Sequence, residues 1–208
     1  MPAELLKKAG DSPRISLDQA FCQRRSIRNF QDRPISLSAV SRLISLAADR
    51  VDAEGHRAAP SAHALYPIEV RVTAGHVQGL DKGVWAARGQ QSEWQEVVAG
   101  DQRGVLSSAA IGDQPWVHEA ASVITLCADM AVCERAFADQ PPAPERGRRY
   151  AWIEAGAIAQ NIALLAATLG LGSVLVAGFD DAATGRVLGL AGFYQPLLHL
   201  CLDLPNHG

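Results

Sequence analysis

The spacing of apolar side chains predicts two helices and one strand in the first part of the chain. Ser16 followed by Gln19 has the form of a capping box, which predicts a short helix directly after it. Ser36 or Ser38 can cap a second helix, in which apolar residues recur at i, i+3, i+4 and i+7. The apolar positions of this amphipathic helix are Val40, Leu43, Ile44 and Ala47. Apolar and polar side chains then alternate over residues 68–73, which predicts a strand with one buried face.

Continuous apolar runs replace this alternation later in the chain. Residues 121–127 are mostly apolar and partly β-branched, which predicts a buried strand, and a helix is expected over residues 130–137. Residues 75–104 are rich in glycine, glutamine and small side chains, and predict only short, weakly periodic elements. Residues 173–177 and 196–202 are apolar runs that predict further strands. Helices and strands mix without a regular βαβ repeat, which favours an α+β fold.

The most apolar long segment covers residues 150–168 and is interrupted chiefly by Glu154, Gln160 and Asn161. A helix that is apolar on nearly every side is expected to be buried on nearly every side. The three polar residues argue against a membrane span, because each would be costly in hydrocarbon. Burial on all sides is easier in a short chain if a partner subunit covers part of the helix. We therefore expect a long central helix at a homodimer interface.

Glycines and a carboxylate mark the ends of elements near the C-terminus. Gly170 and Gly172 are expected to cap the end of the central helix. They do not form a dinucleotide-binding fingerprint, because that motif joins a strand to the start of a helix. Asp180 is expected to cap a last helix that ends near Leu188.

The composition is that of an ordinary globular protein. The 208 residues suggest one domain, residues 1–208, with its core at about 16–204. A net charge of −3 gives no overall basic field for nucleic acid or an anionic membrane. The four cysteines have neither CxxC nor Cys/His spacing, so we expect reduced thiols and no metal site. No apolar signal segment follows the first lysines, so the expected location is the cytoplasm.

A basic cluster follows the first predicted helix. Arg24, Arg25 and Arg28 provide guanidinium groups, and Ser26 provides a hydroxyl. Alternate residues of an extended segment project the same way, so positions 24, 26 and 28 can share a face and bind a phosphate. Basic clusters after helices are also common as solvated surface that offsets the helix dipole. The cluster alone leaves both interpretations open.

A set of short motifs occurs along the chain in a fixed order. It begins with Arg-Arg-Ser-x-Arg-x-Phe at residues 24–30 and Pro-Ser-Ala-x-Ala-Leu-Tyr-Pro-x-Glu at residues 60–69. The later motifs lie at residues 149–150, 154–156, 159–161, 169–172 and 178–181. Together they resemble the flavin-dependent nitroreductase family, and within it the SagB-type branch related to thiazoline and oxazoline dehydrogenases. The resemblance covers about residues 20–200.

This resemblance implies an α+β homodimer, with a central mixed or antiparallel sheet flanked by helices, that binds two FMN molecules at the subunit interface. The implied contacts of the FMN phosphate and ribityl chain are Arg24, Ser26 and Arg28, with Arg25 adjacent. The turn implied at the pyrimidine side of the ring, across the interface, consists of Pro60, Ser61, Ala62, His63 and Ala64. The backbone implied near flavin N5 is that of Val176, Ala177 and Gly178, with Gln114 as a further neighbour.

The implied activity is NAD(P)H-linked reduction of a small nitroaromatic, quinone or enone by ping-pong hydride transfer through flavin N5. The cofactor carries this chemistry, so no catalytic side chain is required, and His63 is the single candidate. His63 replaces a small residue, usually glycine, in the family motif, and packing is its alternative role.

Two alternatives remain. One is a dehydrogenase of a peptide-derived azoline heterocycle. Ala136 and Phe137 stand where that branch has a Lys-Tyr pair, which argues against this alternative. The other is a degenerate flavin-binding or scaffold homodimer without efficient turnover. It is motivated by His63 and by the C-terminal segment, in which Arg186 is the only arginine after Gly178.

Overall fold

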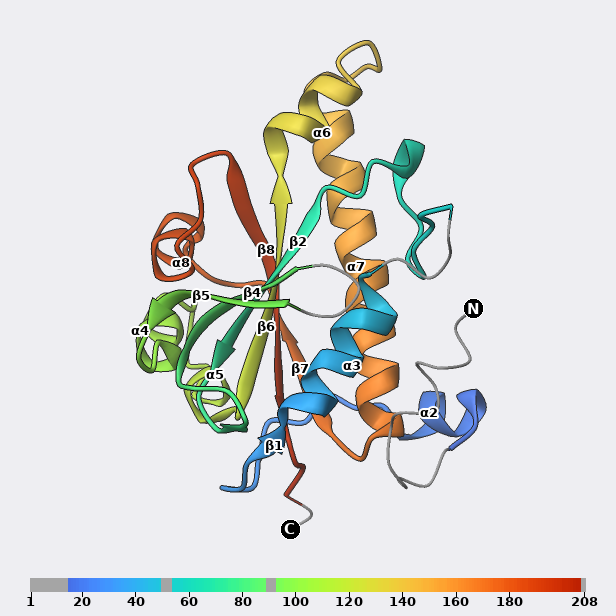
Figure 1. Ribbon diagram of the computed structural model, residues 1–208. Helices are drawn as coiled ribbons and strands as arrows, with labels where there is room; N and C mark the ends of the chain where they lie inside the picture. Colours follow the sequence, from blue (N-terminus) through green and yellow to red (C-terminus); the bar gives the residue numbers. More distant parts are fainter. Residues whose placement is uncertain (1–14, 50–53, 89–92, 207–208) are drawn as a thin grey trace.

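A six-stranded antiparallel sheet, in the order β5-β4-β2-β6-β8-β7, forms the centre of the molecule (Figure 1). The computed structural model describes residues 15–49, 54–88 and 93–206. The strands of this sheet are β2 (Ile68–Ala74), β4 (Gly83–Arg88), β5 (Glu93–Ala99), β6 (Ser122–Asp129), β7 (Gly172–Val176) and β8 (Tyr194–Asp203). A separate parallel pair consists of β1 (Ile35–Ser36) and β3 (Val77–Gln78). The α+β class with a central sheet is confirmed.

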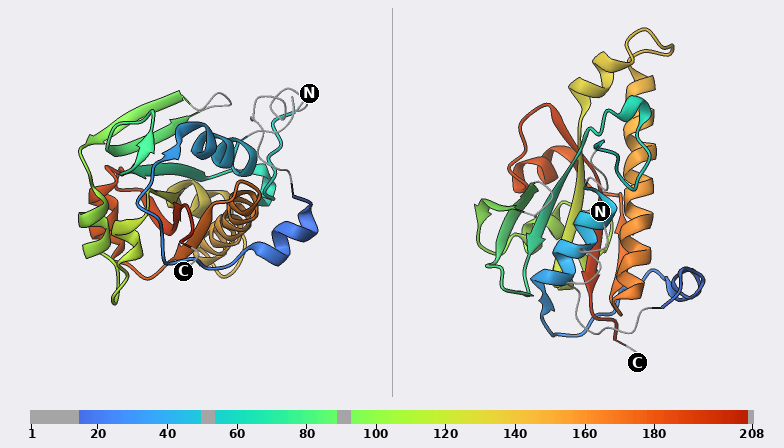
Figure 2. Two further views of the ribbon diagram at one scale, coloured as in Figure 1. Left: turned by 90° about the horizontal axis from the view of Figure 1, so that it is seen from below. Right: turned by 45° about the vertical axis from the view of Figure 1, so that its right-hand side comes forward.

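Helices cover both faces of this sheet (Figures 1 and 2). On one face α3 and α7 pack against each other and share an apolar core with β2, β6 and β8. On the other face α4, α5 and α8 enclose a second core. The helix bounds are α2 (Leu17–Gln23), α3 (Leu37–Ala47), α4 (Arg103–Ser108), α5 (Trp116–Glu119), α6 (Met130–Ala136), α7 (Glu145–Thr168) and α8 (Asp181–Val187).

The predicted helix caps are confirmed. Ser16 Oγ accepts a hydrogen bond from the Gln19 N–H at 3.1 Å, and Gln19 Oε1 accepts one from the Ser16 N–H at 2.7 Å. Ser36 caps α3 and Asp180 caps α8 through their side-chain oxygens. The buried residues of α3 are those that its periodicity predicts: Val40, Leu43, Ile44 and Ala47.

The prediction that the strand at residues 68–73 has one buried face is wrong. Every residue of β2 except Glu69 is buried, including Arg71 and Thr73 on the polar face. The reason is the position of β2 between β4 and β6, with a helical layer over each face of the sheet. The alternation of apolar and polar residues in β2 therefore reflects two largely buried faces of different polarity, and not one buried and one solvent-exposed face.

Residues 75–104 contain more regular structure than their pattern predicts. They form β3, β4 and β5, and the last two complete one side of the sheet. A shift in register between Val84 and Trp85 interrupts the pairing of β4 with β5. Strand β5 is largely exposed at the sheet edge, so neither strand has a regular apolar alternation.

The remaining elements lie close to their predicted positions. The expected strands correspond to β6, β7 and β8, and the expected helix after residue 130 corresponds to α6. The central helix α7 begins at Glu145, five residues before the predicted start. Gly170 ends α7 with a φ of +70°, as a C-cap requires, whereas Gly172 is the first residue of β7 and not a cap.

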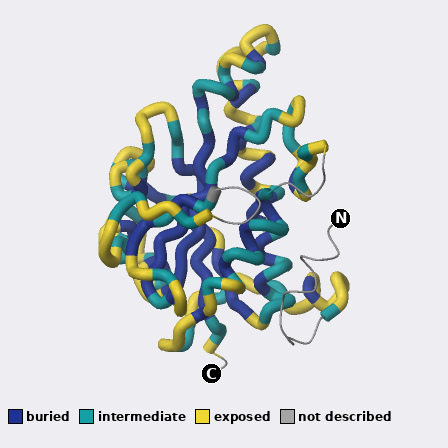
Figure 3. The backbone as a smooth tube through the Cα atoms, in the orientation of Figure 1, coloured by how far each residue is buried: buried dark blue, intermediate teal, exposed yellow. Residues whose placement is uncertain are grey.

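One face of α7 is left uncovered by the part of the chain that the structure describes (Figure 3). The side that faces the sheet is buried, whereas Trp152 and Ile153 are 42% and 60% exposed. Leu17 and Phe21 of α2, which packs beside α7, are 63% and 54% exposed. No helix in the described part of the chain is both long enough and apolar enough to cross a membrane.

Candidate functional site

The segment at residues 24–28 is fixed along the edge strand β7. The Ile27 N–H donates a hydrogen bond to the Ser173 carbonyl at 3.0 Å, and Ser26 pairs with Ser173 in a parallel bridge. A Cβ atom on Gly172 would lie 2.9 Å from the Ile27 side chain. Glycine at this position is therefore what allows the segment to lie so close to β7.

The side chains of this segment provide several cationic donors. Arg24 and Arg25, with Ser173 and the end of α7, line a groove of about 280 Å³. Arg28 does not line this groove, and its guanidinium carbon lies 5.1 Å from the centre of the Trp116 ring. Within the described residues none of the three arginines pairs with a carboxylate. Unpaired guanidinium groups of this kind suit a phosphate or carboxylate ligand.

Gln114 and Gly178 lie together at the other end of β7. Gln114 Nε2 donates to the Gly178 carbonyl at 3.1 Å and to the Ile111 carbonyl at 2.8 Å. The Ile111 N–H also donates to the Gly178 carbonyl, at 2.8 Å. The half-buried Gly178 donates its own N–H to no group in the described part of the chain. One backbone donor thus remains for a ligand.

The residues before Gly178 contribute mainly backbone. The Val176 side chain is buried in the core under α8, and Ala177 is exposed. The ring of Phe179 lies 4.3 Å from the ring of His199. Burial lowers the pKa of His199 to about 3, so this imidazole is neutral and serves packing.

The turn at residues 60–64 has an unusual backbone. His63, Ala64 and Tyr66 have φ values of 55°, 50° and 49°, in the left-handed region that non-glycine residues rarely adopt. Ser61 Oγ accepts a hydrogen bond from the Tyr66 N–H at 2.9 Å, and the Ser61 carbonyl accepts one from the Ala64 N–H at 3.1 Å. The surrounding contacts must overcome about 1 kcal/mol or more for each such residue.

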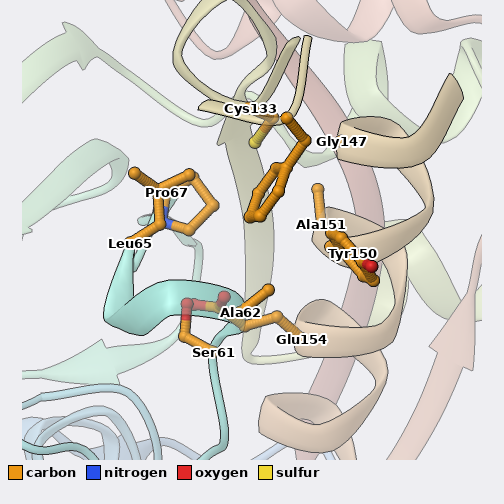
Figure 4. Close-up of a pocket in the computed structure, with 10 residues that line it drawn as sticks. Ser61, Ala62, Leu65, Pro67, Cys133, Gly147, Tyr150, Ala151 and Glu154 are labelled. Carbon is orange, nitrogen blue, oxygen red and sulfur yellow. The ribbon is translucent and has the colours of Figure 1, made fainter. Parts of the chain in front are cut away.

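The turn packs on the first half of α7 (Figure 4). A cavity of about 10 Å³ lies between them, bordered by Ser61, Ala62, Tyr150 and Glu154, with Cys133 of α6 opposite. The exposed His63 ring lies 4.9 Å from the Phe137 ring, which in turn lies 4.7 Å from the Tyr150 ring.

The chain does not bring all of the expected site residues together. The groove beside Arg24 and Arg25 borders α7 at Ala163 and Ala167, whereas the turn borders α7 near Ala151. Twelve residues of helix, from Ala151 to Ala163, correspond to about 18 Å. Within one chain the expected site is therefore two separate parts, at opposite ends of one helix.

Three residues behind the turn are absent from the expected site. The Arg57 guanidinium carbon lies 4.7 Å from the centre of the Tyr66 ring. Glu154 is only 3% exposed, and its Oε1 atom has no hydrogen-bond partner among the described residues. Burial raises the pKa of Glu154, opposed by the Ser61 hydroxyl and by the charge of Arg57. The sequence signals are the motif at residues 60–69, which contains Tyr66, and the carboxylate of Glu154 within an otherwise apolar helix.

The fold and the donors beside β7 define an α+β protein with a candidate site for a small anionic molecule. Among the described residues no three His, Cys, Asp or Glu side chains gather as a metal site would require. Residues 22–202 match the model of the nitroreductase family. The chain belongs to this family.

Individual proteins extend this comparison. A Methanocaldococcus jannaschii protein provisionally named a nitroreductase is 30% identical over 188 residues, which is 90% of each chain. A crystal structure from Ralstonia eutropha with a similar provisional name has a TM-score of 0.77 at 22% identity, covering 97% of this chain and 88% of that one. The NADPH:FMN oxidoreductase of Vibrio harveyi, solved with NAD+, has a TM-score of 0.64 at 23% identity, covering 92% and 69%.

Proposed function

We propose that this protein is an FMN-dependent oxidoreductase that uses NAD(P)H to reduce a small nitroaromatic, quinone or enone. Membership of the nitroreductase family supports an oxidoreductase in general. A related fold belongs to a protein named as an NADPH:FMN oxidoreductase. The observation that carries the proposal is the distribution of unpaired donors along β7.

These donors fit a molecule that combines a phosphate with a flat heteroaromatic ring. Arg24 and Ser26 lie beside the start of β7, and the free N–H of Gly178 lies beyond its end. Five residue steps from Ser173 to Gly178 correspond to about 17 Å of extended chain. A site of this length with cationic groups at one end and a neutral donor at the other suits FMN.

Each residue of the candidate site beside β7 then has a defined role. FMN, when bound, supplies hydride acceptance and donation at N5. Arg24 and the Ser26 hydroxyl bind the phosphate and ribityl chain, with Arg25 beside Arg24 in the groove. Arg28 binds the same part of FMN from outside the groove, on the side of Trp116. Gly178 donates its N–H to the ring, while Gln114 holds the Gly178 carbonyl and so fixes the orientation of this backbone.

The second part of the site comes from a partner subunit in this proposal. Within one chain the turn and the groove at the start of β7 border α7 at places about 18 Å apart. Exposed apolar side chains lie on both α7 and α2, namely Trp152, Ile153, Leu17 and Phe21. A homodimer that buries these side chains would bring the partner's turn, with Ser61, Ala62, His63 and Ala64, to the ring.

We propose the reductive direction in preference to azoline oxidation. At the end of α6 the chain has Ala136 and Phe137, and Phe137 is 2% exposed within the core. Neither side chain can donate or accept a proton. His63, which contacts Phe137 from the exposed side of the turn, is the side chain that can hold a proton for the substrate.

Titration of the apoprotein with FMN tests the proposal. Replacing Arg24 and Arg28 together by alanine removes two charged donors, and we expect FMN to bind about a hundredfold more weakly. Arg186→Ala is the matched control, because Arg186 is an exposed arginine on α8. A folded double variant with unchanged FMN affinity would contradict the assigned phosphate site.

A further inference from the structure

The left-handed turn at residues 60–66 is supported from behind by a small polar cluster. The cluster consists of Ser61 and Tyr66 of the turn, Arg57 before it, and Glu154 of α7. The Ser61 hydroxyl accepts the Tyr66 N–H, and the Tyr66 hydroxyl accepts the Arg57 N–H at 3.4 Å. The contacts of Ser61 and Arg57 with the turn both involve Tyr66, one of its left-handed residues.

Glu154 is the deepest member of this cluster. It is 3% exposed and borders the cavity shared with Ser61 and Ala62 (Figure 4). The other cavity walls are apolar or weakly polar side chains of α6 and α7, among them Cys133, Phe137 and Tyr150. A carboxyl at such a position is costly unless it serves a polar neighbour, and the hydroxyl of Ser61 is the polar group of the turn that faces it.

We propose that Glu154 is a positioning residue: its buried carboxyl faces Ser61 across the small cavity that both residues border, and thereby supports the left-handed backbone that presents His63. The role concerns the shape of the turn in the free chain. Its consequence for turnover rests on the proposed function, in which the turn meets the flavin ring of the partner subunit.

Burial and the neighbouring charges indicate which protonation state of the Glu154 carboxyl supports the turn. Burial raises the pKa of Glu154 and raises that of Asp49 to about 6, and the charge of Arg57 opposes the shift at both carboxyls. Asp49 is ionised at neutral pH and offsets the charge of Arg57, while burial favours the neutral form of Glu154. A neutral carboxyl can both donate and accept hydrogen bonds, so it can bind the Ser61 hydroxyl in either orientation.

Amide hydrogen exchange tests this role without any requirement for flavin. The reporter is the Tyr66 amide, whose N–H donates a hydrogen bond to Ser61 Oγ. The reference is the set of backbone amides in the paired strands β2 and β6. Glu154→Leu fills the space without hydrogen bonding, and we expect the Tyr66 amide to exchange about tenfold faster. Glu154→Gln keeps the neutral polar shape, and we expect a change of less than about threefold. Reference amides should not change.

A double-mutant cycle distinguishes loss of the coupling between Glu154 and Ser61 from a general packing defect in the Glu154→Leu variant. Ser61→Ala alone should accelerate Tyr66 exchange to a similar extent, and adding Glu154→Leu should accelerate it little further, because both changes break one chain of contacts. Full additivity, equal behaviour of the Gln and Leu variants, or unchanged exchange in Glu154→Leu would each overturn the proposal.

The pH dependence separates positioning from packing. After correction for intrinsic exchange, Tyr66 protection in the wild type should fall as pH rises and Glu154 ionises, and Glu154→Gln should show no such step. A step that persists in Glu154→Gln would refute the assignment to Glu154. Flavin content is read separately, so a protein that binds no FMN contradicts the proposed function and leaves the exchange test intact.

Discussion

The two parts of the candidate site are held in place by different forces. The segment at residues 24–28 follows β7 through a backbone hydrogen bond and a glycine that permits close approach. The turn at residues 60–66 depends on side chains, among them a buried carboxyl, a hydroxyl and an arginine over a ring. Backbone pairing does not change with pH, whereas a buried carboxyl does. The comparison teaches that the first part should be sensitive to volume and the second to protonation.

The largest expected effect is that of Gly172→Ala. The added Cβ would lie 2.9 Å from the Cβ and Cγ2 atoms of Ile27, and this Cβ atom cannot move without the backbone. We expect unfolding free energy to fall by about 2 kcal/mol, and FMN binding to be lost as the segment shifts. Denaturant unfolding and FMN titration measure the two effects.

Gly185→Ala is the control for that change. Gly185 lies in α8, and a Cβ there would meet nothing within 4 Å. Alanine in a helix is favoured over glycine, so this variant should gain about 0.5–1 kcal/mol. Equal effects of the two substitutions would show that close approach at β7 is unimportant.

The next effect concerns the meeting of the two parts across a dimer. Ile153→Asp places a charge on the exposed face of α7, where the wild-type side chain is 60% exposed. We expect the folded monomer to persist and its dimerisation to weaken about a hundredfold or more, with loss of bound flavin. Sedimentation velocity reads the oligomeric state.

Val105→Asp provides the matched comparison, because Val105 is 54% exposed on α4, on the other side of the sheet. It should leave the dimer intact. A wild type that sediments as a monomer, or an Ile153→Asp dimer that retains FMN, would break the proposed arrangement.

The pH dependence of stability should separate the two parts further. Because the folded-state pKa of Glu154 is raised above its ordinary value of 4.5, the stability it contributes is full below about pH 4.5 and is lost as pH rises through the raised pKa. Glu154→Gln has no such proton, so its unfolding free energy should fall less with increasing pH.

Two other carboxyls set the background of that experiment. Burial raises the pKa of Asp49 and of Asp203 from 3.8 to about 6 each. Wild type and Glu154→Gln should therefore both lose stability between about pH 4 and pH 6, and only the additional loss of the wild type belongs to Glu154. Parallel curves for wild type and Glu154→Gln would refute a raised pKa at this residue.

The smallest effect is expected for Gln114→Ala. The substitution removes one of the two hydrogen bonds to the Gly178 carbonyl and leaves that of Ile111. Turnover should fall about tenfold, with folding stability reduced by about 1 kcal/mol or less. Gln102→Ala is the matched control, because it removes a glutamine hydrogen bond to the Ala99 carbonyl at the β5–α4 connection, and it should leave turnover unchanged.

Local chemistry allowed much of the fold to be predicted from the sequence. The caps at Ser16, Ser36 and Asp180 are determined by neighbouring residues, and each is confirmed. The strands β4 and β5 were missed, because a register shift at Val84 and exposure at the sheet edge remove their periodicity.

The candidate site likewise contains some residues that the sequence could indicate and others that only the structure reveals. The sequence indicated the segment at residues 24–28 by its charges, and the turn by its motif. It gave no indication that Arg57, Tyr66 and Glu154 meet, because residues 57 and 154 come together only through the packing of the turn on α7. Contacts between segments that are distant in the sequence can be identified only once the fold is known.

An absorbance spectrum of protein purified without added cofactor tests the central claim most directly. It is recorded first as isolated and then anaerobically after addition of NADPH or NADH. The account predicts a yellow dimer whose flavin bands bleach on addition of the nicotinamide. A folded, colourless protein that takes up no FMN on reconstitution would contradict it.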